Sequence, residues 1–313
     1  MMRRPTQLAL VIAGAFPLSA CSEAPELTVT EEPATILICE QATTRIMRMD
    51  ASLDWSSPEA VVWSWSPADD PALDDTQRKW FSNPDEAKPD RGGKQIVITA
   101  SGGGVALIDY ATAQATAVIE IGGNPHSADF LPDGRVVVAS STGDTLSLWD
   151  ADAGEIIQKL TLSDAHGLEW DVMRNCLWAL GGKQIQRLHY HPGADPNPLT
   201  VESTVDLPVT EASKRHPRHG GHDLTPIPGE DAYFVSDMDH LWRFDPATET
   251  FAPLAGRHEM ADVKSISQLA KDGPILVLMA TQDWHSTGPR TLDESEIWEL
   301  PGARIYKARW WQE

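Results

Sequence analysis

The 313-residue chain has little of what builds helices, a disulfide framework or a basic binding surface. Beyond the first twenty residues, no segment keeps a helical period of apolar residues over three turns. The chain has three cysteines, and 25 Lys and Arg residues stand against 46 Asp and Glu, a net charge of -21. So acidic a chain argues against nucleic acid or an anionic membrane surface as a broad partner. The missing helical period argues against a helical fold.

Residues 1–20 are predicted to be a targeting segment. Arg3 and Arg4 precede an apolar run that is too short to span a bilayer, and the segment ends in Leu-Ser-Ala before Cys21. This ending resembles the bacterial lipobox. The resemblance implies that Cys21 becomes the lipidated first residue and that Ser22 directs the protein to the outer membrane, on its periplasmic or outer surface. An ordinary cleaved secretory signal is the alternative.

Residues 21–35 are acidic, contain two prolines and lack aromatic residues, so we expect a tether between the lipid and the folded domain. Without Arg3 and Arg4 the net charge moves from -21 to -23. We assign residues 36–313 to a single domain. Cys39 and Cys176 lie in separate apolar runs, which favours buried thiols over a disulfide or a metal site.

A pattern with a period near forty residues follows each of His126, His166 and His222. The apolar runs RVVVAS, CLWAL and AYFVS begin nine or ten residues after their histidine. Alternating runs that end at Asp109, Asp150 or Asp245 are followed by turn-like segments and a further strand. The pattern predicts a repeated unit of four antiparallel strands.

The units comprise approximately residues 36–66, 85–121, 126–162, 166–207, 222–255 and 264–310. They predict a six-bladed β-propeller. The first unit lacks an innermost strand, so we expect the ring to close with a strand borrowed from the other end of the chain. The segments ILICEQATTRIMRMD, WSW, VITASGGGVALID and PHSADFLPDG together resemble a family of bacterial secreted six-bladed propellers known only as a domain of unknown function.

The first strand of a propeller blade lines the central channel, so His126, His166 and His222 are expected to ring one mouth of it. Lys264 occupies the fourth equivalent position. Three neutral imidazoles at about 2.0–2.2 Å from one point would hold a divalent transition metal, with Zn, Mn, Fe and Ni all open. The alternative is that the histidines line a wet channel and bond to water and backbone.

Basic residues are predicted on the same rim and would select an anionic small ligand. The candidate ligand-binding residues are Arg91, Arg215, Arg218, Arg257 and Gln282. Lys88 is expected beside them. The alternative is a scatter of solvated residues that balance nearby acids.

The expected placement of the site resembles that of propeller polysaccharide lyases such as oligogalacturonate lyase. The resemblance implies a metal that neutralises a uronate carboxylate while a base removes the C5 proton, with Lys264 and His285 as candidate bases. This chain departs from that pattern by offering one histidine per blade. The alternative is a non-catalytic platform for a protein or a glycan, without a metal.

Overall fold

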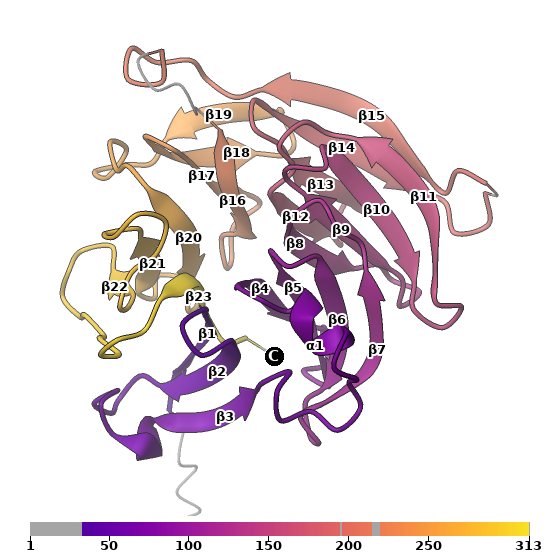
Figure 1. Cartoon of the computed structure of the whole chain (residues 1–313). Helices are drawn as coiled ribbons and strands as arrows, with labels where there is room; N and C mark the ends of the chain where they lie inside the picture. Colours follow the sequence, from indigo (N-terminus) through magenta and orange to yellow (C-terminus); the bar gives the residue numbers. More distant parts are fainter. Residues whose placement is uncertain (1–32, 195, 215–219, 313) are drawn as a thin grey trace, which may run out of the picture. The chain divides into compact units, whose positions relative to one another are not determined.

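Short runs of alternating residues form strands throughout the part of the chain that the structure describes. The computed structural model describes residues 33–194, 196–214 and 220–312. These residues form six antiparallel sheets arranged as the blades of a propeller (Figure 1). The described helices are a 3₁₀ turn, Pro58–Ala60, and the four-residue α1, Gln77–Trp80. The predicted all-β, six-bladed class is confirmed.

The blades follow one another along the chain. The first blade takes β1 (Thr35–Glu40), β2 (Arg45–Asp50) and β3 (Val61–Trp65). The second consists of β4 (Pro84–Pro89), β5 (Gln95–Ala100), β6 (Gly104–Asp109) and β7 (Gln114–Glu120). The third consists of β8 (Pro125–Phe130), β9 (Val136–Ser140), β10 (Thr145–Asp150) and β11 (Glu155–Thr161).

The fourth consists of β12 (Gly167–Asp171), β13 (Cys176–Leu180), β14 (Gln184–Tyr190) and β15 (Leu199–Asp206). The fifth consists of β16 (Gly221–Pro226), β17 (Tyr233–Asp237), β18 (Leu241–Asp245) and β19 (Thr250–Pro253). The sixth has three strands, β20 (Val263–Gln268), β21 (Ile275–Met279) and β22 (Arg290–Thr291).

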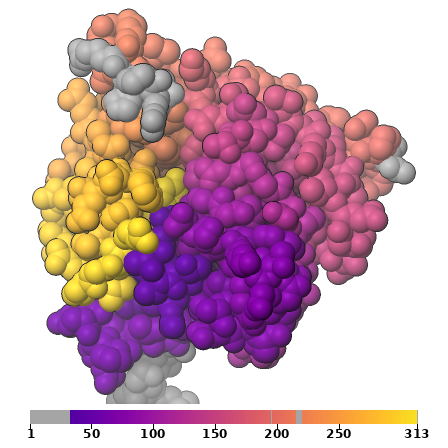
Figure 2. Space-filling view, viewed as in Figure 1, coloured from indigo at the N-terminus to yellow at the C-terminus, as the bar shows by residue number. Residues whose placement is uncertain are grey.

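The last strand, β23 (Ile305–Trp310), closes the ring by pairing with β1 of the first blade. Trp310 faces Ile36 and Ala308 faces Ile38 across this antiparallel pair, and all four belong to one buried apolar cluster. Figure 2 shows the yellow C-terminal part against the indigo start of the chain. A strand borrowed from the other end is therefore confirmed. The prediction that residues 264–310 form one blade is wrong, because β23 pairs with β1 and so belongs to the first blade.

Aspartates end the third strand of several blades and hold the turns that follow. Asp109 accepts hydrogen bonds from the backbone N–H and the hydroxyl of Thr112. Asp150 accepts from the N–H of Ala153, and Asp245 from those of Ala247 and Thr248. These bonds lower the pKa of all three carboxyls. The turns thus start where the sequence places an aspartate.

Apolar side chains fill the space between neighbouring blades. The tryptophans expected in this core are buried: Trp170, Trp178, Trp242, Trp298 and Trp310. Cys39 and Cys176 are buried free thiols, as predicted, and burial raises the pKa of both. No helix among the described residues is long and apolar enough to cross a membrane. The predicted signal segment and Cys21 lie outside the described residues.

Candidate functional site

Six equivalent positions surround one mouth of the channel, at or next to the start of each inner strand. In chain order they hold Asp85, His126, His166, His222, Lys264 and Tyr306, at spacings of 41, 40, 56, 42 and 42 residues. We call these six residues the mouth ring. In β4, β8, β16 and β20 the mouth-ring residue is skipped by the pairing with the next strand. Such β-bulges turn one side chain out of the ladder, here toward the channel.

The structure brings the three histidines together, as the repeat predicts. The ring centroids of His126 and His166 are 4.5 Å apart, and those of His166 and His222 are 5.1 Å apart. His126 and His166 are buried, and His222 is partly buried. The metal role that the sequence suggested for them stays a prediction.

The other mouth-ring residues lie on either side of the histidines. Lys264 Nζ is 3.2 Å from His222 Nε2, so Lys264 lies where the sequence placed it. On the other side, Tyr306 stacks on His126 with centroids 5.4 Å apart, and an Asp85 carboxylate oxygen is 3.4 Å from His126 Nδ1. Asp85 also accepts a hydrogen bond from the Ser101 hydroxyl at 2.7 Å. The mouth ring is therefore one connected group.

Burial keeps two of the imidazoles neutral near pH 7. It lowers the pKa of His166 well below the usual value, and the charge of His126 acts in the same direction. Burial followed by the Lys264 charge lowers the pKa of His222 in the same way. Burial also lowers the pKa of Lys264 itself, against the effect of Asp262. Neutral imidazole is the form that binds a metal or accepts a hydrogen bond.

The protein leaves ring nitrogens available for a ligand. His166 Nδ1 lies 2.9 Å from the Asp164 carbonyl oxygen and donates to it, which leaves Nε2 as the atom with a free lone pair. His222 Nδ1 is buried without a hydrogen-bond partner, and His126 Nδ1 lies 3.4 Å from the Asp85 carboxylate. A backbone or carboxylate contact on the far ring nitrogen is typical of histidines that bind metals. The donor types therefore suit a divalent transition metal, but the three imidazoles do not bring ligand atoms within 4.8 Å of one another.

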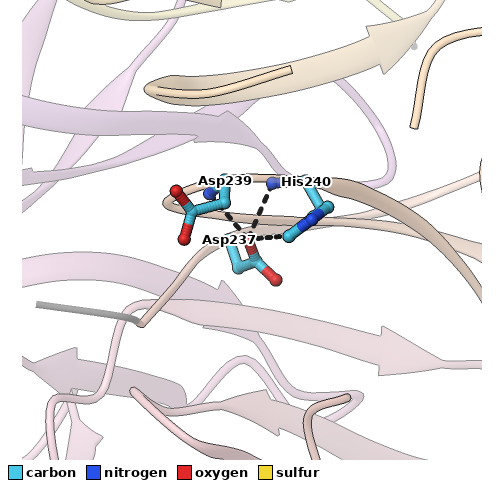
Figure 3. Close-up of side chains that lie close together, drawn as sticks. All are labelled: Asp237, Asp239 and His240. Atoms are coloured by element: carbon cyan, nitrogen blue, oxygen red, sulfur yellow. Dashed lines mark hydrogen bonds and ion pairs between the residues drawn. The ribbon is translucent and has the colours of Figure 1, made fainter. Parts of the chain in front are cut away.

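A second group of potential metal ligands lies in the turn between β17 and β18 (Figure 3). In the described part of the chain, Asp237, Asp239 and His240 have ligand atoms within 4.8 Å of one another, and the three histidines do not form such a group. The Asp237 carboxylate already accepts from two backbone N–H groups, each at 2.8 Å, and from Trp242 Nε1 at 2.7 Å. These three hydrogen bonds indicate that Asp237 stabilises the turn.

The structure describes only part of the predicted basic rim, and two of its predicted members lie at the opposite mouth. Arg215 and Arg218 lie outside the described residues. Arg91 follows the far end of β4, where its guanidinium donates to the Trp170 carbonyl, and Lys88 donates to the Leu168 carbonyl. The expectation that Arg91 and Lys88 share the rim of the histidines is wrong, because inner strands begin at the mouth ring and end at the opposite mouth.

The other rim candidates are exposed or lie apart from the mouth ring. Arg257 is exposed and lines a hollow with Asp272 and Asp293 at the sixth blade, and Gln282 is exposed in the loop after β21. His285 is buried, which lowers its pKa. Its neighbour Trp284 donates to Gln41, which in turn donates to Asp85. Gln41 thus links this loop to the mouth ring.

Four buried charges occupy the channel next to the mouth ring. Lys307 Nζ is 3.0 Å from Glu86 and 3.3 Å from Asp223, and Arg309 Nη2 is within 2.6 Å of both carboxylates. Asp223 also accepts from the Ile266 N–H of the next blade. Burial alone would raise the pKa of Glu86, but Arg309 and Lys307 lower it. We call these four residues the charge cluster.

Asp85 and Tyr306 were missed at the level of the sequence, although a signal for both exists. Asp85 precedes His126 by 41 residues and Tyr306 follows Lys264 by 42, close to the spacings that relate the other mouth-ring residues. Extending the period in both directions from the histidines finds them. The search for histidines alone does not.

Three solved structures that are similar to this chain share little sequence identity with it. Hydrazine synthase of Kuenenia stuttgartiensis is 12% identical over 71% of this chain and 64% of its own, with a TM-score of 0.48. The dihydro-heme d1 dehydrogenase NirN is 12% identical over 89% of this chain and 54% of its own, with a TM-score of 0.50. The Cps50 (Swd1) β-propeller domain of Myceliophteria thermophila is 16% identical over 74% of this chain and 71% of its own, with a TM-score of 0.47.

This chain therefore spans less than two thirds of the length of the first two structures, and the likeness concerns the fold alone. No curated protein matches the sequence. A family model, described as a family of unknown function (DUF6528), matches residues 7–313. The chain belongs to this family of six-bladed propellers of unknown function.

Proposed function

We propose that the mouth ring binds a small anionic ligand, a uronate-containing carbohydrate, through a divalent transition metal held by His126, His166 and His222. One observation carries the proposal: three blades each supply an imidazole, with adjacent ring centroids 4.5 and 5.1 Å apart, and a fourth supplies Lys264. Two of these imidazoles have a lowered pKa. A metal with open coordination positions would attract the carboxylate of the ligand.

Lys264 gives the site a second means of binding an anion. Its ammonium group, when protonated, is positioned beside His222 to pair with a ligand carboxylate. Its lowered pKa also suits it to act as a base. For these reasons we propose Lys264, rather than His285, as the residue that would take a proton from the ligand.

The reaction class that we propose is β-elimination from a uronate. Lys264 removes the C5 proton, the electron pair forms the C4–C5 double bond, and the C4–O bond to the neighbouring sugar breaks. The leaving oxygen takes up a proton from solvent. A bound metal supplies charge neutralisation at the carboxylate, which makes the C5 proton more acidic.

Metal content measured by mass spectrometry tests the first step. Purified protein given Zn or Mn should retain about one equivalent of metal, and the His166→Ala variant less than about a tenth. His191→Ala, which removes an exposed histidine after β14, is the matched control and should retain the metal. Wild-type protein that also holds less than about a tenth of an equivalent would refute the metal site.

A metal-free binding platform is the second candidate. Two observations favour it: Lys264 Nζ already approaches His222 Nε2 at 3.2 Å, and the histidine ligand atoms are not gathered within 4.8 Å. Oligogalacturonate is the probe that separates the two functions. A rise in ultraviolet absorbance from the unsaturated product supports the lyase, whereas binding without that rise supports the platform.

We also propose that the propeller is attached to the outer membrane through a lipid on Cys21. The lipobox-like Leu-Ser-Ala-Cys sequence supports this proposal. Attachment would hold the mouth ring within the cell envelope, where an acidic glycan or a protein partner is within reach.

A further inference from the structure

The opposite mouth of the channel contains a cavity of about 320 Å³ that the proposed function does not use. It lies at the far ends of the inner strands, whereas the mouth ring lies at their starts. Its charged lining residues are Lys88, Asp90, Arg91, Asp129, Glu169 and Arg309. Arg309 is also a member of the charge cluster, which therefore lies between the two mouths.

Two cations that line this cavity, Arg91 and Lys88, make few contacts with the rest of the protein. Arg91 makes a bond to the Trp170 carbonyl at 3.2 Å, and no carboxylate of the described chain lies within ion-pair distance of its guanidinium. Lys88 donates to the Leu168 carbonyl and is 3.8 Å from the Glu169 carboxylate. A guanidinium carries five N–H donors and an ammonium three, so both cations have donors left for a ligand.

The acids of the cavity accept hydrogen bonds from the backbone or have a raised pKa. Asp129 accepts from the Phe130 N–H at 2.8 Å and the Trp170 N–H at 2.7 Å, and Asp90 accepts from the N–H groups of Lys94 and Gln95. Burial, followed by the charge of Asp129, raises the pKa of Glu169 to about 8, against the opposing charges of Lys88, Arg309 and Arg91. The raised pKa favours the protonated form of Glu169, whose hydroxyl can donate a hydrogen bond.

We propose that this cavity binds a small carboxylate, to which Arg91 and Lys88 donate hydrogen bonds. Arg309 does not compete for the ligand, because Glu86 and Asp223 neutralise it. Leu37, Pro226 and Trp311 also line the cavity and provide apolar contacts for the hydrocarbon part of the ligand. The site is separate from the mouth ring and needs no metal.

Calorimetric titration with benzoate tests the proposal, with benzyl alcohol and benzylamine as neutral and cationic probes of similar shape. At pH 7, benzoate should bind more tightly than benzyl alcohol or benzylamine. Its affinity should fall by about tenfold per pH unit above pH 8, because the ionised Glu169 repels the carboxylate. Benzylamine would show the reverse dependence, since it pairs with the ionised form.

Four variants locate the binding. Arg91→Ala should weaken benzoate binding at least about tenfold. Lys94→Ala, which removes an exposed cation from the same turn, should leave it unchanged. Glu169→Gln keeps a donor but cannot ionise, so its affinity should not fall above pH 8. His166→Ala should bind benzoate like the wild type, which separates this cavity from the mouth ring.

Two results would overturn the proposal. The first is tighter binding of benzylamine or benzyl alcohol than of benzoate at pH 7. The second is benzoate binding that Arg91→Ala leaves intact or that His166→Ala abolishes. Either result would mean that Arg91 and Lys88 do not select the ligand.

Discussion

Replacing Lys307 with methionine should destabilise the propeller far more than removing an exposed ion pair does. The Lys307 side chain is 2% exposed and its ammonium contacts Glu86 at 3.0 Å and Asp223 at 3.3 Å. Methionine keeps most of the side-chain volume and removes the charge. Two buried carboxylates would then share Arg309 as their cationic partner.

The size of the effect follows from the burial of these charges. Breaking a buried pair by removing one partner typically costs about 3–5 kcal/mol, because an uncompensated charge remains in a poorly solvated place. With a urea dependence of roughly 3 kcal/mol per molar, the unfolding midpoint would fall by about 1–2 M. Since β23, β4 and β16 supply the four charges, the loss should affect the whole ring.

Urea unfolding followed by tryptophan fluorescence measures the change. The control is Arg243→Met, since the Arg243 and Glu230 side chains are 37% and 48% exposed and such a pair contributes less than about 1 kcal/mol. Adding Glu86→Gln to Lys307→Met should recover part of the loss, because it restores electrical balance. A loss for Lys307→Met no larger than that for Arg243→Met would refute the reasoning.

Two further predictions concern Glu169 and Cys21. Glu169 has a pKa of about 8 in the folded protein and near 4.5 in the unfolded chain, so the folded protein binds this proton more tightly. Tighter proton binding stabilises the fold. The contribution is complete below pH 4.5 and is lost as the pH rises through 8. Wild type should therefore lose more thermal stability than Glu169→Gln between pH 7 and pH 9, as measured by circular dichroism, and equal losses would contradict the assignment. Cys21→Ser should move the protein from the membrane to the soluble fraction of the native host, and unchanged fractionation would contradict lipidation at Cys21.

The sequence predicts much of the fold because each blade repeats the same succession of strands and turns. Asp109, Asp150 and Asp245 end strands for a local reason, since their carboxylates bond to the next few N–H groups. The assignment of Ile305–Trp310 to the first blade could not be made locally. It depends on pairing with Ile36 and Leu37, nearly the whole chain away.

The candidate site was predictable where the repeat defines it. His126, His166, His222 and Lys264 meet because they occupy equivalent positions in successive blades. Arg91 was expected at the mouth that holds the histidines, but it follows the end of β4 and therefore reaches the opposite mouth. The charge cluster was not predicted at all, since its members are 2 to 223 residues apart and none has a motif.

The bulges in the inner strands allow the residues at the channel mouth to be substituted one at a time. Each bulged residue stands outside the register of its sheet, so the ladder does not depend on which side chain it carries. Aspartate, histidine and lysine already occupy such places within one chain. Relatives that share the blades can therefore acquire different ligands by substitution at these positions, without rebuilding the scaffold.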